Sequence, residues 1–383
     1  MNIAKDFTGA SSTSKLLIIS SEFPPGPGGI GNHAYNLAKY LQQIEGLEIT
    51  VLTDTNFTSN NELKDFDNKN DFKIFRIFRV NPIILTYIRR IVLAGKLISK
   101  HDKIIFSGKF SLWLAGIYKP LFGKKEFIAV VHGSELDLPN PRIKRFTHNS
   151  LNQCNKIISV SRYTQNFLPI HKNGQQRIII ANGIDVSEAN TDHKNYTTAV
   201  KTKALTLLTV GNVTPRKGQK NIIRALPEIR KSFPEIHYHI VGLPTHKEAL
   251  IEFAQKLGVL SNITFYGKLP RKELLNMYKQ CDIFMMLSDH TADGDFEGFG
   301  IAVLEANLWR KPAIGSRNSG IADAIDDGVT GILVDQQNDK EIAQAVSGIY
   351  NNYESYSQKA YQWSLLHDWE KIVRQYYKAI YEY

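Results

Sequence analysis

The sequence contains little cysteine and no long apolar run. Only two of its 383 residues are cysteine, Cys154 and Cys281, and neither lies in a Cys-x-x-Cys or Cys/His ligand spacing. This excludes a disulfide framework and a structural zinc site. No stretch of about 18 apolar residues occurs, and the first fifteen residues lack the apolar core of a signal peptide. We therefore expect a cytoplasmic protein that does not span a membrane.

Acidic residues are scarce in one part of the chain. Residues 1–200 hold 25 Lys and Arg against 16 Asp and Glu, whereas residues 201–383 hold 22 against 21. The stretch 89–125 has one acid, Asp102, and nine basic residues: Arg89, Arg90, Lys96, Lys100, Lys103, Lys109, Lys119, Lys124 and Lys125. One interpretation is a surface for an anionic membrane or an anionic lipid-linked acceptor, at about 1 kcal/mol per basic side chain; the protein would then lie peripherally on the inner face of the membrane. The other is an ordinary helix with a solvated charged face. No RNA motif or recognition-helix motif accompanies the charge, so nucleic acid is not an expected partner.

The order of elements predicts two domains, as the chain length also does. Strand-like apolar runs alternate with helical patterns, which is typical of parallel sheets with crossover helices. The expected strands are 16–20, 48–54, 103–107, 127–133 and 156–161, then 205–211, 236–242, 263–267, 282–288, 311–316 and 331–335. The predicted fold class is α/β, with two Rossmann-like domains whose parallel sheets face each other across a cleft. We place the first domain at 1–190, a linker at 191–204 and the second at 205–366, with an amphipathic tail helix, 367–383, returning to the first domain.

The first strand is followed by a glycine-rich turn. Gly26, Gly28 and Gly31 form a literal G-x-G-x-x-G, and Asp54 ends the next strand, so a dinucleotide-binding site is one interpretation. The prolines in the long approach to Gly28 disfavour the tight turn that such a site requires. The narrower prediction is that backbone amides at a helix start, around Gly29 and Gly31, approach phosphate or sugar oxygens.

The second domain opens with a comparable turn. A strand ending at Gly211 leads through Asn212 to Arg216-Lys217-Gly218 at a helix start. Cations beside a positive helix end would stabilise a departing diphosphate. Such side chains in a loop are more often simply solvated.

The segment 293–306 carries the most specific pattern. Glu297 is followed by Gly298, Phe299 and Gly300, and Glu305 comes eight residues after Glu297. We interpret this as a loop carboxylate and a helix carboxylate that accept hydrogen bonds from sugar and ribose hydroxyls, with amides at Phe299 and Gly300 facing phosphate or sugar oxygens. Two solvated acids would not need the glycines.

These motifs resemble the retaining GT-B glycosyltransferases of family four (group 1) across roughly residues 16–380, closest to the phosphatidylinositol mannosyltransferase-like branch. The resemblance implies that Glu297 contacts the transferred sugar, Glu305 the ribose and Lys217 the diphosphate. It further implies a histidine near the reaction centre at His132 and a glycine loop at Gly29 to Gly31. The segment Gly267-Lys268-Leu269 is similar to the one that borders the nucleotide base.

Two positions depart from the family pattern. Asn212 stands where an arginine is usual, and we expect Arg216 to replace part of its charge. Asp323 stands where a glutamate is usual. Both changes bear on donor preference and activity.

The expected reaction moves a hexose from a GDP- or UDP-linked donor to a hydroxyl of a glycan or lipid-linked glycan, with retention and without metal or cofactor. Donor would bind mainly the second domain and acceptor the first. Four alternatives remain: a metal bound by Asp293 and Asp295, an NAD-dependent oxidoreductase, a catalytically impaired nucleotide-sugar-binding protein, and a nucleotide-sugar epimerase of the same fold.

Overall fold

The protein consists of two compact units. The computed structural model describes residues 14–26, 28–55, 60–189 and 204–382. Unit 1 holds the described residues of Met1–Gly183 and Trp369–Tyr383, and unit 2 is built from Ile184–Asp368. The division follows Gly183, where we expected residue 190. The predicted linker, 191–204, lies outside the described residues apart from Ala204.

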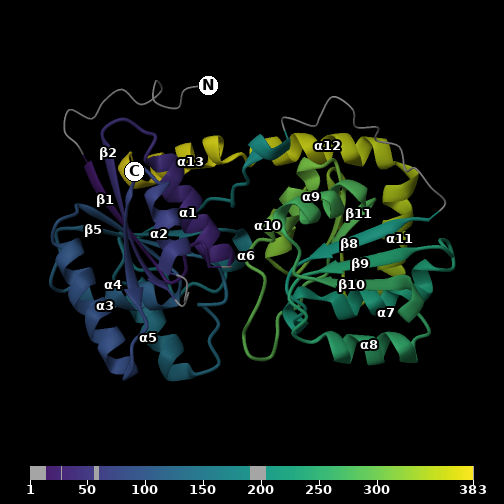
Figure 1. Ribbon diagram of the computed structural model, residues 1–383, viewed down its shortest axis with the longest axis horizontal. Helices are drawn as coiled ribbons and strands as arrows, with labels where there is room; N and C mark the ends of the chain where they lie inside the picture. Colours follow the sequence, from purple (N-terminus) through teal and green to yellow (C-terminus); the bar gives the residue numbers. More distant parts are fainter. Residues whose placement is uncertain (1–13, 27, 56–59, 190–203, 383) are drawn as a thin grey trace. The chain divides into compact units, whose positions relative to one another are not determined.

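Unit 1 is built on a seven-stranded parallel sheet with the order β3-β2-β1-β4-β5-β6-β7 (Figure 1). Its strands are β1 (Ser14–Ser20), β2 (Leu47–Thr55), β3 (Lys73–Phe78), β4 (Lys103–Ser107), β5 (Glu126–Val131), β6 (Lys156–Ser159) and β7 (Gln176–Ile179). The central strands are buried on both faces, since Ile18 of β1 pairs with Val51 and Ile105 and all three are inaccessible to solvent. The prediction of buried strands from continuous apolar runs is therefore confirmed for these strands.

Helices cover both faces of this sheet (Figure 1). They are α1 (Gly29–Leu41), α2 (Asn60–Asn68), α3 (Ile83–Ile98), α4 (Lys109–Tyr118), α5 (Pro141–Leu151), the short α6 (Arg162–Gln165) and α13 (Trp369–Tyr381). The helix α13, from the far end of the chain, packs against α1 and contributes Trp369, Val373 and Tyr376 to the core. Its buried residues recur every three to four positions, which is the apolar stripe of an amphipathic helix.

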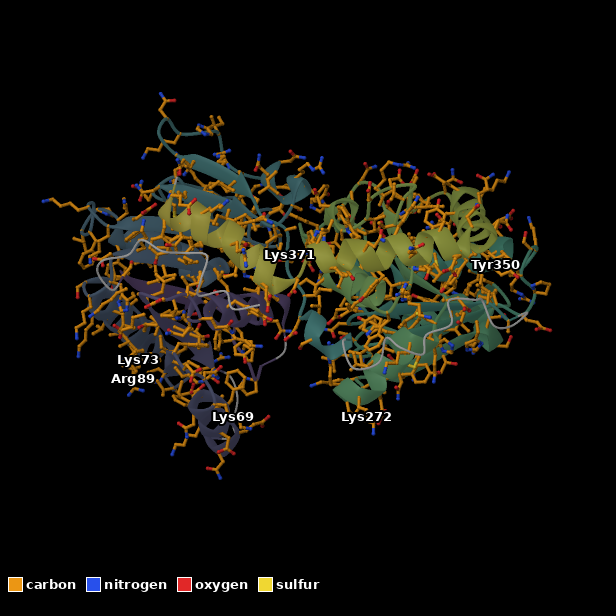
Figure 2. The ribbon with its side chains drawn as sticks, turned by 90° about the horizontal axis from the view of Figure 1, so that it is seen from above. Lys69, Lys73, Arg89, Lys272, Tyr350 and Lys371 are labelled. Atoms are coloured by element: carbon orange, nitrogen blue, oxygen red, sulfur yellow. The ribbon has the colours of Figure 1, made fainter. Side chains whose placement is uncertain are left out.

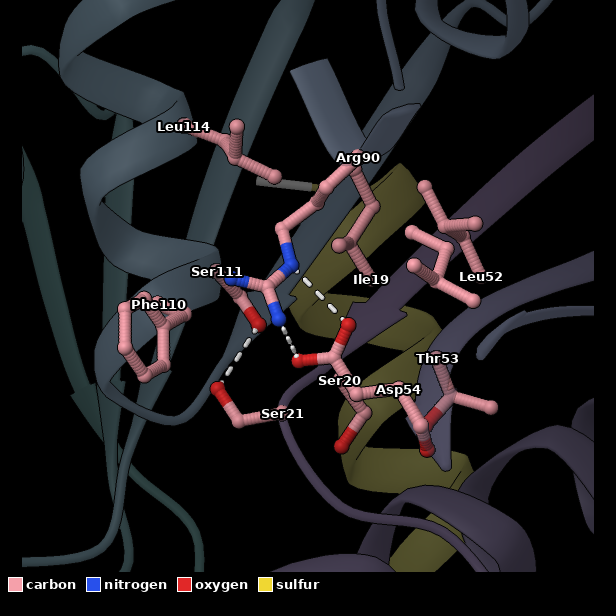
Figure 3. Close-up of a pocket in the computed structure, with 11 residues that line it drawn as sticks. Ile19, Ser20, Ser21, Leu52, Thr53, Asp54, Arg90, Phe110, Ser111 and Leu114 are labelled. Atoms are coloured by element: carbon pink, nitrogen blue, oxygen red, sulfur yellow. Dashed lines mark hydrogen bonds and ion pairs between the residues drawn. The ribbon is translucent and has the colours of Figure 1, made fainter. Parts of the chain in front are cut away.

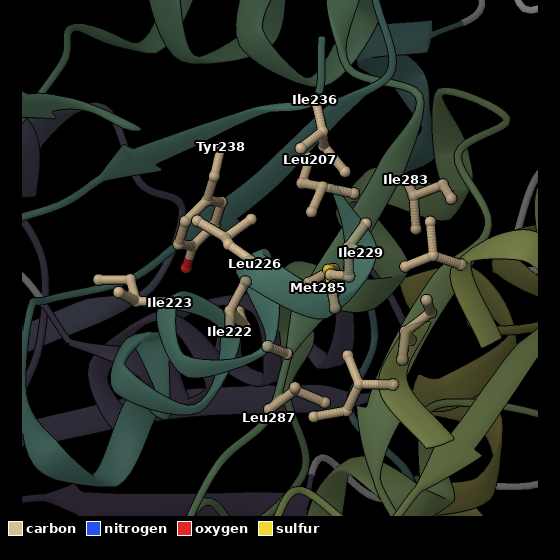
Figure 4. Close-up of a cluster of buried hydrophobic side chains, with 14 of the residues drawn as sticks. Leu207, Ile222, Ile223, Leu226, Ile229, Ile236, Tyr238, Ile283, Met285 and Leu287 are labelled. Atoms are coloured by element: carbon tan, nitrogen blue, oxygen red, sulfur yellow. The ribbon is translucent and has the colours of Figure 1, made fainter. Parts of the chain in front are cut away.

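Unit 2 repeats the plan with six parallel strands in the order β10-β9-β8-β11-β12-β13. These are β8 (Thr206–Val210), β9 (His237–Val241), β10 (Ile263–Gly267), β11 (Ile283–Met286), β12 (Ala313–Ser316) and β13 (Gly331–Val334). The helices are α7 (Gln219–Ile229), α8 (Lys247–Lys256), α9 (Arg271–Gln280), α10 (Ile301–Leu308), α11 (Asp339–Asn351) and α12 (Tyr353–Leu366). Figure 4 shows part of the core, where Leu226 and Ile229 of α7 meet Leu207 and Met285 of the sheet.

In both units the strand order reverses beside the first strand, between β1 and β4 and between β8 and β11. Open parallel sheets bind ligands beyond the carboxyl ends of their strands at such a switch point. The chain thus has one such position in each unit.

The predicted fold class of two Rossmann-like parallel-sheet domains is confirmed. All eleven expected strands are present, with ends that differ by a few residues. The strands β3 and β7 were not expected. Both lie at sheet edges and are only partly buried, so their sequences lack the continuous apolar run of an interior strand. Within the part of the chain that is described, no helix is long and apolar enough to cross a membrane.

Candidate active site

The loop after β8 carries two cations at the switch point of unit 2. It contains the short 3₁₀ helix η4 (Pro215–Lys217) and ends at Gly218, which has φ 71°. A Cβ at Gly218 would lie 1.7 Å from the carbonyl oxygen of Leu287, just beyond β11. Only glycine fits there. The glycine therefore holds Arg216 and Lys217 against the end of the neighbouring strand.

Glu297 binds both of these cations. Its Oε2 lies 2.7 Å from Lys217 Nζ and also pairs with Arg216, while Arg216 Nε reaches Asp295 Oδ2 at 2.9 Å. The side chains of Lys217 and Glu297 are only 15% and 12% exposed. Burial alone would raise the pKa of Glu297, but Lys217 and Arg216 outweigh it and hold that pKa below its usual value. Glu297 is therefore ionised, and together with Asp295 it offsets the charges of the two cations.

A second loop packs closely, at Gly320, on the segment that follows Glu297. The backbone N–H of Gly320 donates to the Glu297 carbonyl oxygen at 2.9 Å. A Cβ at Gly320 would lie 2.2 Å from the carbonyl carbon and oxygen of Gly298, so no larger residue fits there without moving backbone. Gly300, with φ 88°, then caps the N-terminus of α10. This packing fixes where the Glu297 carboxylate points.

Phe299 is buried, 2% exposed, between the two glycines. Its side chain thus anchors the loop in the core. The prediction that the amides of Phe299 and Gly300 face a ligand stays a prediction.

Glu305 is held at a different place in unit 2. Its Oε2 accepts a hydrogen bond from the Tyr278 hydroxyl at 2.7 Å, and its Oε1 pairs with Arg271 at 3.2 Å. Both partners belong to α9. Gly267 is the last residue of β10, and Lys268 and Leu269 lie between this strand and the start of the helix. Glu305, the predicted ribose contact, is thus bound to α9, and the predicted base-bordering segment leads directly into the same helix.

The two departures from the family pattern can now be located. Asn212 is exposed, and its Oδ1 accepts from the Leu243 N–H at 3.4 Å. Arg216, proposed as its substitute, shares Glu297 with Lys217, so these two cations lie together. The substitution of Arg216 for the missing arginine stays a prediction. Asp323 ends the 3₁₀ helix η6 (Gly320–Asp323) that begins at the glycine packed on Gly298.

The aspartates considered for a metal have other partners. Asp295 binds Arg216, and Asp293 accepts from the Thr291 hydroxyl. Among the described residues, no group of three or more His, Cys, Asp or Glu side chains is arranged to share a metal ion.

His132 lies in unit 1, directly after β5. Its Nε2 is 3.0 Å from the Ser107 hydroxyl, and its backbone N–H donates to Glu135 Oε1 at 2.6 Å. The His33 ring meets it edge-on at 4.9 Å between centroids. Burial lowers the pKa of His132 to about 4, so the imidazole is neutral near pH 7.

The glycine turn of unit 1 carries a carboxylate of its own. Gly29 opens α1 after Gly28, and the Gly31 amide donates to the Glu22 side chain. A Cβ at Gly28 would lie 2.1 Å from Glu22 Oε2. An internal anion therefore already uses the amide that was expected to face a phosphate or sugar. The NAD interpretation is not supported either, because Asp54 is paired with Arg90.

The basic stretch 89–125 does not present all of its charges to one surface. Four of its members bind groups of unit 1: Arg90, Lys103, Lys119 and Lys125. Others, including Arg89, are exposed, and Figure 2 shows Arg89 on the periphery of the unit with Lys69 and Lys73. The charges of this stretch are thus divided between internal partners and exposed side chains, and the interpretation as a membrane-facing surface stays a prediction.

Sequence reasoning missed an exposed apolar face on α3. Ile84 and Val92 are 56% and 63% exposed, and their neighbours on the helix share this exposure: Ile83, Leu85, Tyr87, Ile88 and Ile91. The signal was present in the run IILTYIRRIVLAGKLI, which is apolar around most of the helix. A surface helix ordinarily has an apolar stripe on one side and polar residues on the other.

Comparison with known proteins covers both units. The model of glycosyl transferases group 1 matches residues 191–363, and that of Glycosyltransferase Family 4 matches residues 27–188. A GDP-mannose-dependent alpha-(1-6)-phosphatidylinositol monomannoside mannosyltransferase of Mycolicibacterium smegmatis is 27% identical over 87% of this chain and 88% of its own length. A D-inositol 3-phosphate glycosyltransferase of the same organism is 23% identical over 69% of this chain and 63% of its own.

Solved structures share the fold at low identity. Anabaena Alr3699/HepE, in complex with UDP and glucose, superposes with a TM-score of 0.75 at 17% identity, covering 97% of this chain and 100% of that one. A glycosyltransferase from Rickettsia africae gives the same score and identity over 97% and 98%. Because the two family models cover the two halves of the chain in succession, the protein belongs to the group 1, family 4 glycosyltransferases and uses a nucleotide sugar.

Proposed function

We propose that this glycosyltransferase moves a hexose from a GDP- or UDP-linked donor to a hydroxyl of a glycan or lipid-linked glycan, with retention of configuration and without metal. One observation carries the proposal: Lys217 and Arg216 converge on Glu297 at the switch point of unit 2. Two cations and an ionised carboxylate in one small region suit a sugar diphosphate, which has an anionic part and a part rich in hydroxyls.

The cations would stabilise the leaving diphosphate. As the bond from the anomeric carbon to the phosphate oxygen breaks, negative charge develops on the diphosphate, and preorganised cations stabilise it strongly in a partly buried site. Lys217 and Arg216 supply the positive charge that a divalent metal provides in other enzymes. Once they turn to the diphosphate, Glu297 is free to accept hydrogen bonds from sugar hydroxyls.

Retention requires the acceptor oxygen to bond to the face of the sugar that the diphosphate leaves. The hydroxyl proton departs with a diphosphate oxygen, so the step needs no permanently charged base. A neutral His132 suits a positioning role beside the sugar, because its pKa near 4 keeps it uncharged at physiological pH. The turn at Gly29 to Gly31 would assist from the same unit once the Gly31 amide exchanges the Glu22 side chain for a sugar or phosphate oxygen.

The relatives support the choice of donor and acceptor classes. The mycobacterial relatives are named as GDP-mannose-dependent enzymes that act on a phosphatidylinositol mannoside. A fold neighbour was crystallised with UDP-glucose. We therefore retain both GDP- and UDP-linked hexoses as donors, bound through Lys217, Arg216 and Glu305.

We also propose that unit 1 meets an anionic membrane on its inner face. The support is the coincidence of exposed basic residues such as Arg89 and Lys96 with the apolar side chains of α3. Apolar side chains enter the headgroup region while basic ones attract anionic lipid. Binding to vesicles with and without anionic lipid tests this part separately.

A donor panel tests the main proposal. Purified protein is offered GDP- and UDP-linked hexoses, with binding followed by thermal shift and transfer by product release. Lys217→Ala should lower turnover by about 100-fold, whereas Lys220→Ala, which removes an exposed charge three residues along α7, should not. Donor binding without hydrolysis or transfer of any of these sugars would leave the catalytically impaired nucleotide-sugar-binding protein as the better account. Unchanged turnover in Lys217→Ala would refute the role of Lys217.

A further inference from the structure

Unit 1 contains a pocket that the sugar-donor chemistry does not use. It has a volume of about 230 Å³ and lies at the carboxyl ends of β1, β2 and β3, against the first turns of α3. Its lining includes Ser21, Asp54, Arg79, Tyr87 and Arg90. Pockets for whole small-molecule ligands typically have about 300–1,000 Å³. This one therefore suits a single group of a larger molecule.

A buried ion pair forms one wall of the pocket. Arg90 Nε donates to Asp54 Oδ1 at 2.9 Å, and Arg90 Nη2 pairs with the other oxygen (Figure 3). The rings of Phe110 and Tyr87 lie 4.7 and 5.4 Å from the guanidinium carbon. Arg90 is thus fixed by its partners, and Asp54 offsets its charge. Arg90 Nη1 is buried and has no hydrogen-bond partner among the described residues.

Arg79 gives the pocket its net charge. It is exposed, lines the pocket, and makes no hydrogen bond or ion pair through its side chain within the described part of the chain. With Asp54 balancing Arg90, Arg79 leaves an excess of one positive charge. A planar guanidinium with free N–H groups suits the paired oxygens of a phosphate.

The helix that supplies the pocket wall also supplies the exposed apolar face. Ile83, Thr86, Tyr87 and Arg90 line the pocket, and their spacing places them on one side of α3. The exposed residues next to them on the helix are Ile84, Leu85, Ile88, Ile91 and Val92. A ligand whose anionic group enters the pocket can therefore continue along apolar side chains.

We propose that this pocket binds the phosphate of a lipid-linked acceptor, with Arg79 as its anchor and the apolar chain following the exposed face of α3. The inference rests on the proposed function, since it concerns the acceptor of the same reaction. It adds a specificity determinant: an acceptor with phosphate next to its sugar or polyol is held, and its neutral counterpart is not. The exposed apolar residues of α3 then have a defined occupant.

The first arm of the test uses soluble probes. Glycerol 3-phosphate, glycerol and glycerate are titrated into the full-length protein, together with GDP and UDP. Arg79→Gln should weaken glycerol 3-phosphate binding about 10- to 100-fold, the usual effect of losing a hydrogen bond to a charged group, and leave nucleotide binding unchanged. Lys217→Ala should do the reverse. Lys69→Gln removes an exposed charge elsewhere in unit 1 and should change neither.

The second arm uses vesicles of phosphatidylglycerol and of phosphatidylcholine. Ile88→Ser, at a half-exposed position of α3, should leave glycerol 3-phosphate binding intact and weaken phosphatidylglycerol binding at least fivefold. Arg79→Gln should weaken both.

The outcomes separate this inference from the proposed function. The phosphate pocket would be overturned if Arg79→Gln bound glycerol 3-phosphate as tightly as the wild type, or if the wild type bound glycerate as tightly as glycerol 3-phosphate. Nucleotide binding would in that case still support the transferase mechanism. Unchanged vesicle binding in Ile88→Ser would overturn the lipid-linked acceptor. If the wild type bound glycerol 3-phosphate but neither GDP nor UDP, the result would count against the donor site of the proposed function and not against the phosphate pocket.

Discussion

Replacing Glu297 with glutamine should make the protein bind nucleoside diphosphates more tightly and transfer sugar more slowly. Glu297 Oε2 lies 2.7 Å from Lys217 Nζ and also pairs with Arg216. A diphosphate has to take these cations away from the carboxylate. Glutamine is nearly isosteric but uncharged, so that competition disappears.

The size of the effect follows from the partial burial of the pair. A hydrogen bond to a charged group contributes about 1.5–3 kcal/mol net. A carboxylate some 5 Å from a phosphate charge adds repulsion of roughly 3 kcal/mol at an effective dielectric constant near 20, part of which solvent relaxation removes. We take about 2 kcal/mol, which corresponds to roughly 30-fold tighter binding of GDP or UDP. Transfer in a single turnover should fall about 100-fold, because the sugar loses an ionised partner.

Calorimetric titration of GDP and UDP measures the first effect, and single-turnover product formation the second. The matched control is Asp295→Asn, since Asp295 also binds Arg216 but its side chain is 43% exposed. Exposed pairs contribute only about 0.2–1 kcal/mol, so nucleotide affinity should change less than fivefold. Equal or weaker nucleotide binding by Glu297→Gln would show that the carboxylate does not restrain the cations, and the argument from this site would fail.

Two further predictions concern stability and pH. Gly320→Ala should destabilise unit 2 by about 1–3 kcal/mol and weaken donor binding, because its Cβ would lie 2.2 Å from Gly298 backbone atoms. The control is Gly348→Ala inside α11, where the nearest atom to the new Cβ lies at 3.4 Å. In chemical unfolding this control should be neutral or slightly stabilising. Burial lowers the pKa of His132 to about 4 in the folded protein. In the unfolded chain the same imidazole is protonated below about pH 6.5, whereas in the folded protein it stays neutral down to about pH 4. His132 therefore favours folding above pH 6.5 and this contribution is lost as pH falls toward 4. In denaturant titrations at pH 5 and 7, His132→Asn should lose less stability on acidification than the wild type. The substitution also removes the His132 contribution to the lowered pKa of His33, which acts in the same direction. An identical pH dependence would contradict the burial of a neutral His132.

The sequence by itself determined the two-domain α/β plan. Eleven strands were readable because parallel strands covered on both faces need uninterrupted apolar runs, such as LLIIS in β1 and FMM in β11. The edge strands β3 and β7 were not predicted, because one side of each is open to solvent and such a strand does not need an uninterrupted apolar run. The motifs around Lys217 and Glu297 were recognised from their resemblance to a known family.

Tertiary structure alone decided which charges meet. Lys217 and Glu297 are eighty residues apart and come together because β8 and β11 are neighbours at the point where the strand order reverses. In unit 1, tertiary packing pairs Asp54, interpreted from the sequence as half of a nucleotide fingerprint, with Arg90 of α3. Tertiary packing also divides the basic stretch 89–125 between internal partners and solvent. The partner of a charged side chain depends on which strands become neighbours in the sheet, and the local sequence does not contain that information. The burial of an interior strand, in contrast, can be read from its own apolar residues.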